Sequence, residues 1–275
     1  RPLRHPDGLF EALIPRRKNR FDYRLDVSWA DGSDGLYADA YAYGPQLSDF
    51  DLGLLSAGVH QRPYTVMGAH LMQHGEVSGV RFAVWAPNAS RVSVVGSFNG
   101  WDGRRHPMRL RHDAGVWEIF IPHVALGDLY KFELVAANGA LLPLKADPFA
   151  FAAQLRPDTA SIVAALPNVT PLPEGRAAAN ERHAPISVYE VHAGSWREGK
   201  HGRFPSWDEL AAQLPDYAAS LGFTHLQLMP ISEHPFDGSW GYQTLGLYAP
   251  TARFGPPEGF ARFVAACHAR GLGIL

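Results

Sequence analysis

The sequence predicts a multidomain chain in which an all-β, immunoglobulin-like sandwich is followed by a parallel β/α segment. Two observations lead to this prediction. Between about residues 60 and 166, short apolar stretches recur at about ten-residue spacing with turn residues between them, which is typical of a sandwich. Beyond Pro185, strand-like and helix-like patterns alternate, which indicates parallel strands joined by helices.

Residues 1–50 form a first segment of short strand-like pieces between turns. Residues 21–29 alternate apolar and polar side chains, the pattern of a half-buried strand, and Asp31-Gly32 follows as a turn. The segment is small for a core of its own, so we expect it to be the end of a domain that is cut at its start.

Residues 60–166 carry the pattern of a complete sandwich. The candidate strands are Gly79–Trp85, Arg91–Gly96, Val116–Ile121 and Leu129–Val135. Trp85 and Trp117 lie inside these strands, and we expect both in the core. Residues 167–184 are rich in Pro, Ala and Glu and are predicted to be a linker.

Residues 185–275 carry the β/α pattern. Ile186–Val191 reads as a strand, and Ser206 with Glu209 three residues later predicts a capping box at the start of a helix over Trp207–Ser220. The remaining predicted elements are a strand over Thr224–Met229, a helix over Pro257–Arg270 and a third strand beginning at Leu272. Because so few β/α units cannot close a barrel, we expect the sequence to be part of a longer protein.

Composition excludes several classes of partner. The 275 residues have a formal net charge of −2 and scattered arginines, which argues against nucleic acid or an anionic membrane surface. A single cysteine, Cys267, allows no internal disulfide and fits a cytoplasmic protein. No signal peptide or membrane-length apolar run is present, and we expect no metal and no cofactor.

The stretch Pro230–Gln243 is the best candidate for a functional loop. It directly follows a predicted strand, where α/β folds keep their chemistry. It contains two carboxylates, one imidazole and three aromatic rings, namely Glu233, Asp237, His234, Phe236, Trp240 and Tyr242. Acids beside aromatic faces suit a carbohydrate site, because rings stack on sugar faces and acids handle glycosidic oxygens. The alternative is a Pro- and Gly-braced loop whose aromatics pack inward.

Four motifs give the sequence a resemblance to glycogen branching enzymes, the 1,4-alpha-glucan transferases of the alpha-amylase superfamily. They are Arg81–Asn88, Gly96–Asp102, Tyr189–His192 and Ile231–Gln243, the last with Ser232 where many members carry Asn. The resemblance spans essentially the whole chain. It implies that residues 1–50 are the remnant of an N-terminal β-sandwich. It also implies that residues 60–166 are a glycogen-binding-type module (carbohydrate-binding module family 48). Residues 185–275 would then start a catalytic (β/α)8 TIM barrel of glycoside hydrolase family 13 and end in its third strand.

The resemblance also implies a reaction. Branching enzymes cleave an alpha-1,4-glucan by retaining double displacement and transfer the segment to a 6-hydroxyl, forming an alpha-1,6 branch. The family's nucleophilic Asp and acid/base Glu follow later barrel strands. They are therefore expected after residue 275, and Glu190, Glu233 and Asp237 are not assigned to these roles. The expected partner is an alpha-glucan.

Six residues are implied as substrate-binding. Tyr242 matches the superfamily tyrosine that stacks under the sugar being cleaved, and His192, Trp240 and Asp237 are placed at the same cleft. His192 could instead orient its neighbours by hydrogen bonds, and Trp240 could wedge the loop in place. Trp101 and Lys131 match glucan-binding positions of related modules.

Those modules carry a second tryptophan where this chain has Ala140–Leu142. Half of the expected aromatic clamp is therefore absent, and the alternative role for the module is docking against the barrel. Two other functions also stay open. One is a debranching or trehalose-releasing hydrolase of the same superfamily, and the other is a non-catalytic glucan-binding protein.

Overall fold

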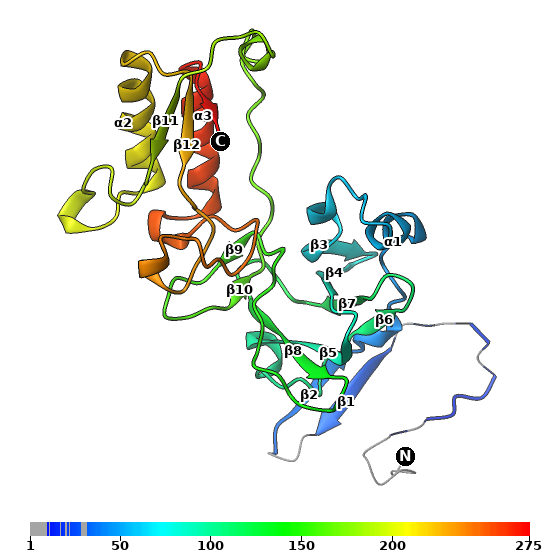
Figure 1. Ribbon diagram of the computed structural model, residues 1–275. Helices are drawn as coiled ribbons and strands as arrows, with labels where there is room; N and C mark the ends of the chain where they lie inside the picture. Colours follow the sequence, from blue (N-terminus) through cyan, green and yellow to red (C-terminus); the bar gives the residue numbers. More distant parts are fainter. Residues whose placement is uncertain (1–9, 11, 17, 20, 22, 29–31) are drawn as a thin grey trace. The chain divides into compact units, whose positions relative to one another are not determined.

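The computed structural model describes residues 10, 12–16, 18, 19, 21, 23–28 and 32–275 (Figure 1). The chain divides into two compact units, residues 1–42 and 43–275. In the first unit, β1 (Arg24–Ser28) pairs antiparallel with β2 (Asp34–Ala38). The strand predicted over residues 21–29 contains β1, while Trp29 and the Asp31 of the predicted turn lie outside the described residues.

Two four-stranded antiparallel sheets form the sandwich in the second unit, with strand orders β3-β4-β7-β6 and β5-β8-β10-β9. The strands are β3 (Gly68–His74), β4 (Val77–Trp85), β5 (Ala89–Gly96), β6 (Arg109–Arg111), β7 (Val116–Pro122), β8 (Leu129–Ala136), β9 (Ala152–Ala153) and β10 (Ser161–Ile162). The four predicted strands correspond to β4, β5, β7 and β8. The others escaped prediction because β3 mixes apolar with polar residues and β6, β9 and β10 are too short to show a period.

Aromatic and branched side chains fill the space between the sheets. The Phe82 ring of β4 meets the Tyr130 ring of β8 edge-on, with 4.9 Å between centroids. Trp117 is buried as expected, and its indole N–H donates to the Ala86 carbonyl over 2.9 Å. The same expectation is wrong for Trp85, which is 63% exposed because it is the last residue of β4, where the strand leaves the sheet.

A helix that was not predicted, α1 (Asp49–Ser56), packs on the sandwich. Ser48 caps its N-terminus by accepting a hydrogen bond from the Asp51 N–H. Leu47 and Leu52 share a buried cluster with Ala83 of β4 and Val116 of β7. The residues just before position 60 therefore belong to the sandwich core.

Residues 185–275 have the predicted β/α order. The elements are β11 (Val188–Val191), α2 (Trp207–Ser220), β12 (His225–Leu228), α3 (Pro257–Ala269) and β13 (Gly273–Ile274). The strands pair in parallel in the order β11-β12-β13. The capping box is present: the Ser206 hydroxyl accepts from the Glu209 N–H, and the Glu209 carboxylate accepts from the Ser206 N–H over 2.8 Å. The two helices share one core with the strands (Figure 1).

The segment predicted as a linker makes buried contacts in its second half. A short 3-10 turn, η4, covers Ala178–Asn180. Just before it, Arg176 is 5% exposed, and its guanidinium lies 3.3 Å from the His225 Nε2 at the start of β12. The composition of this stretch gave no sign of that packing.

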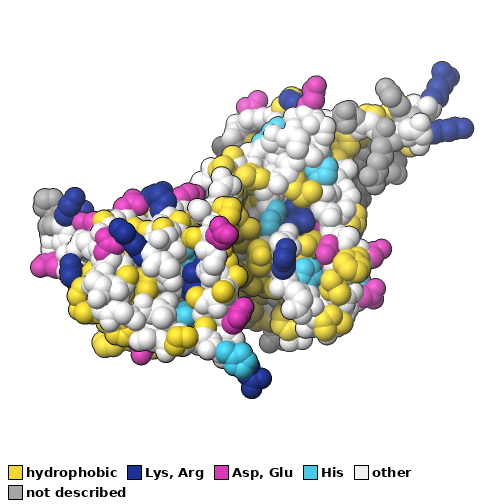
Figure 2. Space-filling view, turned by 90° about the horizontal axis from the view of Figure 1, so that it is seen from above, with side chains coloured by type: hydrophobic (Ala, Val, Ile, Leu, Met, Phe, Trp, Pro, Cys, Tyr) yellow, Lys and Arg dark blue, Asp and Glu magenta, His cyan; other side chains and the backbone are white. Residues whose placement is uncertain are grey.

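The sandwich contacts the β/α segment through the loop after β12. The Leu247 N–H donates to the Pro148 carbonyl over 3.0 Å, and the Phe149 and Tyr248 rings stack with 5.4 Å between centroids. On the face drawn in Figure 2, basic and acidic side chains are interspersed rather than gathered by sign. Among the described residues, no helix combines the length and the hydropathy needed to cross a bilayer.

Candidate functional site

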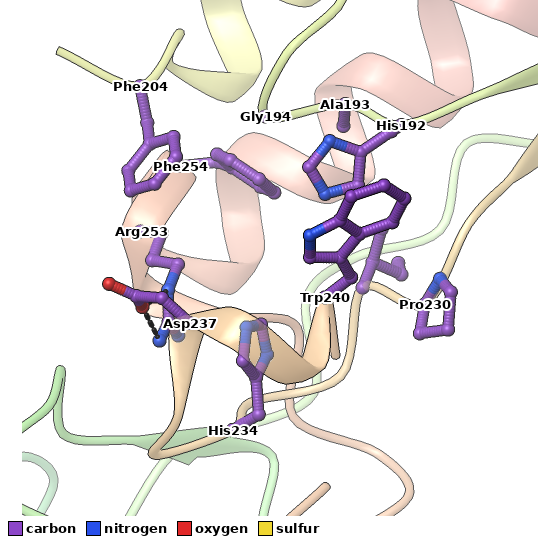
Figure 3. Close-up of a pocket in the computed structure, with 11 residues that line it drawn as sticks. His192, Ala193, Gly194, Phe204, Pro230, His234, Asp237, Trp240, Arg253 and Phe254 are labelled. Atoms are coloured by element: carbon purple, nitrogen blue, oxygen red, sulfur yellow. Dashed lines mark hydrogen bonds and ion pairs between the residues drawn. The ribbon is translucent and has the colours of Figure 1, made fainter. Parts of the chain in front are cut away.

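A pocket of about 220 Å³ lies at the carboxyl ends of β11 and β12 (Figure 3). These two parallel strands end at the same edge of the sheet, so the loops that follow them meet there. The lining residues are His192, Ala193, Gly194, Phe204, Pro230, Ile231, His234, Asp237, Trp240, Arg253 and Phe254. Of the six residues implied as substrate-binding, the structure brings together three here: His192, Asp237 and Trp240.

Two of these residues present rings to the pocket. The His192 imidazole lies against the Trp240 indole, with 5.4 Å between centroids, and its Nδ1 is 2.7 Å from the Ser195 hydroxyl (Figure 3). Burial lowers the pKa of His192, and the nearby His234 lowers it further, so the imidazole is neutral at neutral pH. Trp240 is 57% exposed, so its ring is accessible to a ligand.

Tyr242 lies in the same loop but does not line this pocket, and its side chain is 67% exposed. Gly241 sets this arrangement. Its φ is +88°, and a Cβ at this position would come within 2.5 Å of the Pro230 carbonyl oxygen. Only glycine allows the loop to approach Pro230 this closely with that backbone conformation, and the turn leaves the Tyr242 ring on the surface.

The Glu233 carboxylate is buried and fully engaged. It is 1% exposed and accepts hydrogen bonds from the Arg253 guanidinium (2.7 Å), the Thr251 hydroxyl (3.2 Å) and the Ala252 N–H (2.6 Å). Ala252 begins the short helix η7 (Ala252–Phe254). Glu233 therefore fastens the loop after β12 to η7 and is not directed at a ligand.

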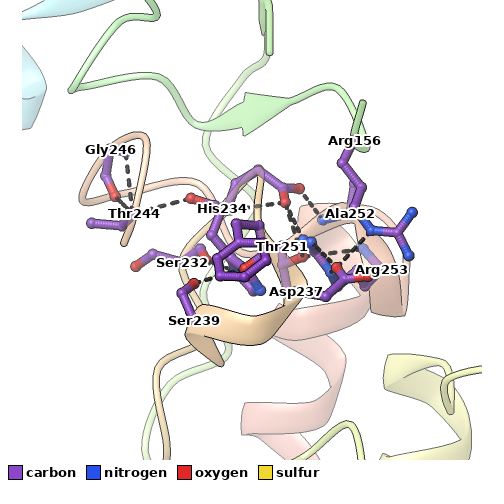
Figure 4. A network of polar contacts seen from close by, with 12 residues as sticks. Arg156, Ser232, His234, Asp237, Ser239, Thr244, Gly246, Thr251, Ala252 and Arg253 are labelled. Carbon is purple, nitrogen blue, oxygen red and sulfur yellow. Dashed lines mark hydrogen bonds and ion pairs between the residues drawn. The ribbon is translucent and has the colours of Figure 1, made fainter. Parts of the chain in front are cut away.

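Asp237 is the first residue of the short helix η6 (Asp237–Ser239). Its carboxylate is held by two arginines (Figure 4). Its Oδ1 accepts from the Arg156 Nε over 2.6 Å and from the Arg253 Nε over 3.0 Å, with the Arg253 Nη2 also in contact. These hydrogen bonds, from Arg156 first, lower the pKa of Asp237, so the group is ionised at neutral pH. An ionised carboxylate in a sugar-sized pocket is an acceptor for hydroxyl groups.

A second hollow of about 630 Å³ adjoins the pocket and shares Gly194, Phe204 and Arg253 with it. Leu155 and Arg156 of the sandwich form part of its wall. Sequence reasoning missed Phe204, Arg253 and Arg156 as site residues. No periodicity or spacing marks them, because they reach the site from three segments that only the tertiary fold brings together.

The remaining two predicted residues lie on the sandwich, away from the pocket. Trp101 is 38% exposed, and its backbone N–H donates to the Gly96 carbonyl over 3.0 Å. Gly96 pairs with Tyr130, the neighbour of Lys131 in β8, so the backbones of Trp101 and Lys131 lie close together. The Lys131 ammonium donates to the Thr159 hydroxyl over 2.7 Å. Glucan binding by this pair remains a prediction.

No group of three or more His, Cys, Asp or Glu side chains in the described part of the chain is arranged to hold a metal ion. The pocket itself presents aromatic rings, the neutral imidazole of His192 and the ionised carboxylate of Asp237. That set can bind a polyhydroxylated ligand by stacking and hydrogen bonding.

The chain was compared with models of known families and with solved structures, and both comparisons found similar carbohydrate-related proteins. Residues 66–150 match the family model described as carbohydrate-binding module 48 (isoamylase N-terminal domain). A crystal structure of a protein provisionally named an alpha amylase, from Salmonella typhimurium, is 27% identical and superposes with a TM-score of 0.57, over 76% of this chain and 32% of that one. A product complex of SpuA, a multi-modular glycogen-degrading pneumococcal virulence factor, shares the fold with a TM-score of 0.58 at 20% identity.

The match with SpuA covers 76% of this chain but only 26% of SpuA. The chain thus spans about a third and about a quarter of these two proteins. Within this chain, residues 66–150 match carbohydrate-binding module 48, and the chain as a whole is similar to a solved structure named an alpha amylase.

Proposed function

We propose that this chain is part of a glycogen branching enzyme, which cleaves an alpha-1,4-glucan and transfers the segment to a 6-hydroxyl. The observation that carries a glucan-related function is the aromatic pocket at the strand ends next to a carbohydrate-binding module. Branching in particular is favoured by the amino-acid sequence of Ile231–Gln243, which resembles the corresponding segment of branching enzymes.

In this proposal the described residues bind and orient the glucan. The exposed rings of Trp240 and Tyr242 stack on sugar faces. The ionised Asp237 accepts a hydrogen bond from a sugar hydroxyl, and the neutral His192 donates or accepts one at the same wall. The module either binds a glucan chain at Trp101 and Lys131 or docks against the β/α segment.

Bond cleavage is assigned to other residues of the enzyme. A retaining glycosidase needs two carboxyl groups about 5 Å apart, one as nucleophile and one as acid. The pocket lining contributes one carboxylate, Asp237, which is ion-paired to two arginines, and Glu233 is committed to η7. The reacting pair is therefore proposed to come from residues outside these 275.

A second candidate is a glucan hydrolase, favoured by the names of the two similar structures, one an alpha amylase and one glycogen-degrading. One experiment separates the two activities. The full-length protein that contains this chain is incubated with amylose, and alpha-1,6 linkages and reducing ends are both counted.

Branching predicts new alpha-1,6 linkages with few new reducing ends. Hydrolysis predicts the reverse. Glucan binding without either change would leave a non-catalytic binding protein and would refute the proposal.

A further inference from the structure

The two oxygens of Asp237 are in different situations. All of its hydrogen bonds from the described residues end on Oδ1, where the Nε groups of Arg156 and Arg253 and the Arg253 Nη2 converge. Oδ2 receives none of them, and the side chain as a whole is 44% exposed. One oxygen is therefore anchored by the protein, while the other receives no hydrogen bond from the described residues and can accept one from a ligand.

The two arginines hold Oδ1 from different parts of the fold. Arg253 is 3% exposed, and its Nη1 is already bonded to Glu233 and Thr251, so it is a fixed point. Arg156 is 40% exposed and comes from the sandwich, between β9 and β10. The carboxylate thus lies between a buried arginine of the β/α segment and an arginine of the sandwich (Figure 4).

Arg253 alone fixes one point of the carboxylate. A carboxylate bonded through a single oxygen to a single guanidinium can still swing its second oxygen about that contact. A second donor on the same oxygen, approaching from a different element, fixes the position of Oδ1 from two directions and so restricts rotation about the Cβ–Cγ bond. A preorganised acceptor binds its ligand with a smaller entropy cost.

We propose that Arg156 is a positioning residue through which the sandwich holds Asp237 so that Oδ2 accepts a hydrogen bond from a sugar hydroxyl. The inference rests on the proposed glucan function of the pocket. It makes the sandwich a structural part of the substrate site, rather than only a tether to the polymer.

The test uses the full-length protein and amylose, with three variants. Arg156→Ala is expected to raise KM about 5-fold with kcat changed less than 2-fold, because a ground-state contact to the sugar is weakened. Arg156→Lys keeps a cation that can reach Asp237 and is expected to recover part of that loss. The matched control is Arg262→Ala, which removes an exposed ion pair to Asp208 between α2 and α3, away from the pocket.

A double-mutant cycle asks whether the effect passes through Asp237. In an Asp237→Asn background, Arg156→Ala is expected to change KM less than 2-fold. A carboxyl titration by NMR provides a readout independent of activity: Arg156→Ala should raise the pKa of Asp237 towards its ordinary value, since the first cause of its lowering is removed.

The inference is overturned if Arg156→Ala behaves like Arg262→Ala in KM, or if its effect persists undiminished in the Asp237→Asn background. Melting curves of all variants show whether a loss reflects unfolding, and the lysine variant keeps the test decisive if the alanine variant is unstable. The proposed function fails separately, if the wild-type full-length protein forms no new alpha-1,6 linkages from amylose. The titration of Asp237 then still decides whether Arg156 holds the carboxylate.

Discussion

Replacing Glu233 by alanine tests whether this carboxylate is structural. The substitution removes the acceptor for the Arg253 guanidinium, the Thr251 hydroxyl and the Ala252 N–H. All of these groups lie beside a residue that is 1% exposed, so water cannot readily replace the lost oxygens. The Arg253 side chain, 3% exposed, would keep only its bonds to Asp237 and Thr251.

The expected cost follows from the burial of the pair. Removing one partner of a buried ion pair destabilises a protein by about 3–5 kcal/mol when the other charge is left uncompensated. Because Arg253 keeps its ion pair with Asp237, we expect the lower end of this range, about 3 kcal/mol. For a unit of this size, each kcal/mol lowers Tm by about 2–4 °C, so Glu233→Ala should lower Tm by roughly 6–12 °C. Glu233→Gln keeps the shape and one acceptor oxygen, and should cost about 1–3 kcal/mol.

Thermal unfolding followed by circular dichroism measures these shifts. The control is Glu190→Ala, which removes an exposed carboxylate from β11 and should change Tm by less than about 2 °C. Hydrogen exchange in residues 230–254 shows whether the loss is local. A Tm for Glu233→Ala equal to that of the control would refute the structural role, and so would a Glu233→Gln variant with wild-type Tm but no activity.

Three further predictions concern pH and glucan binding. Burial raises the pKa of Asp147 to about 6, so its contribution to stability is fully present below about pH 4 and is lost, by about 3 kcal/mol, as pH rises through 6. The difference in urea unfolding between wild type and Asp147→Asn across pH 4–7 should show this loss, and a constant difference would contradict it. Tyr242→Ala should lower turnover of amylose by about 5-fold or more without changing Tm, whereas Tyr242→Phe keeps the stacking ring and should keep activity. Unchanged activity in the alanine variant would place Tyr242 away from the reacting sugar. Trp101→Ala should weaken glycogen binding about 5-fold in affinity electrophoresis, compared with Trp85→Ala as an exposed-tryptophan control, and equal binding would favour a docking role for the module.

Local patterns in the sequence were sufficient for much of the fold. The sandwich strands β4, β5, β7 and β8 were predicted because alternation and turn residues are properties of adjacent positions. The start of α2 was predicted because the Ser206–Glu209 capping box is formed by residues three apart. The loop after β12 was predicted to be functional because its Pro, Gly, acidic and aromatic residues are contiguous, and five of its residues line the pocket: Pro230, Ile231, His234, Asp237 and Trp240.

The roles within that loop were decided by tertiary structure. Nothing local distinguishes Glu233, which is buried against η7, from Asp237, which is exposed at the pocket and held by Arg156 from 81 positions away in the chain. Trp85 was misplaced for the same kind of reason, because a strand's last residue shows the same alternation whether or not the sheet continues past it. Periodicity records which face of an element is apolar, whereas ion pairs between distant segments and the limits of a sheet depend on how the elements pack in three dimensions.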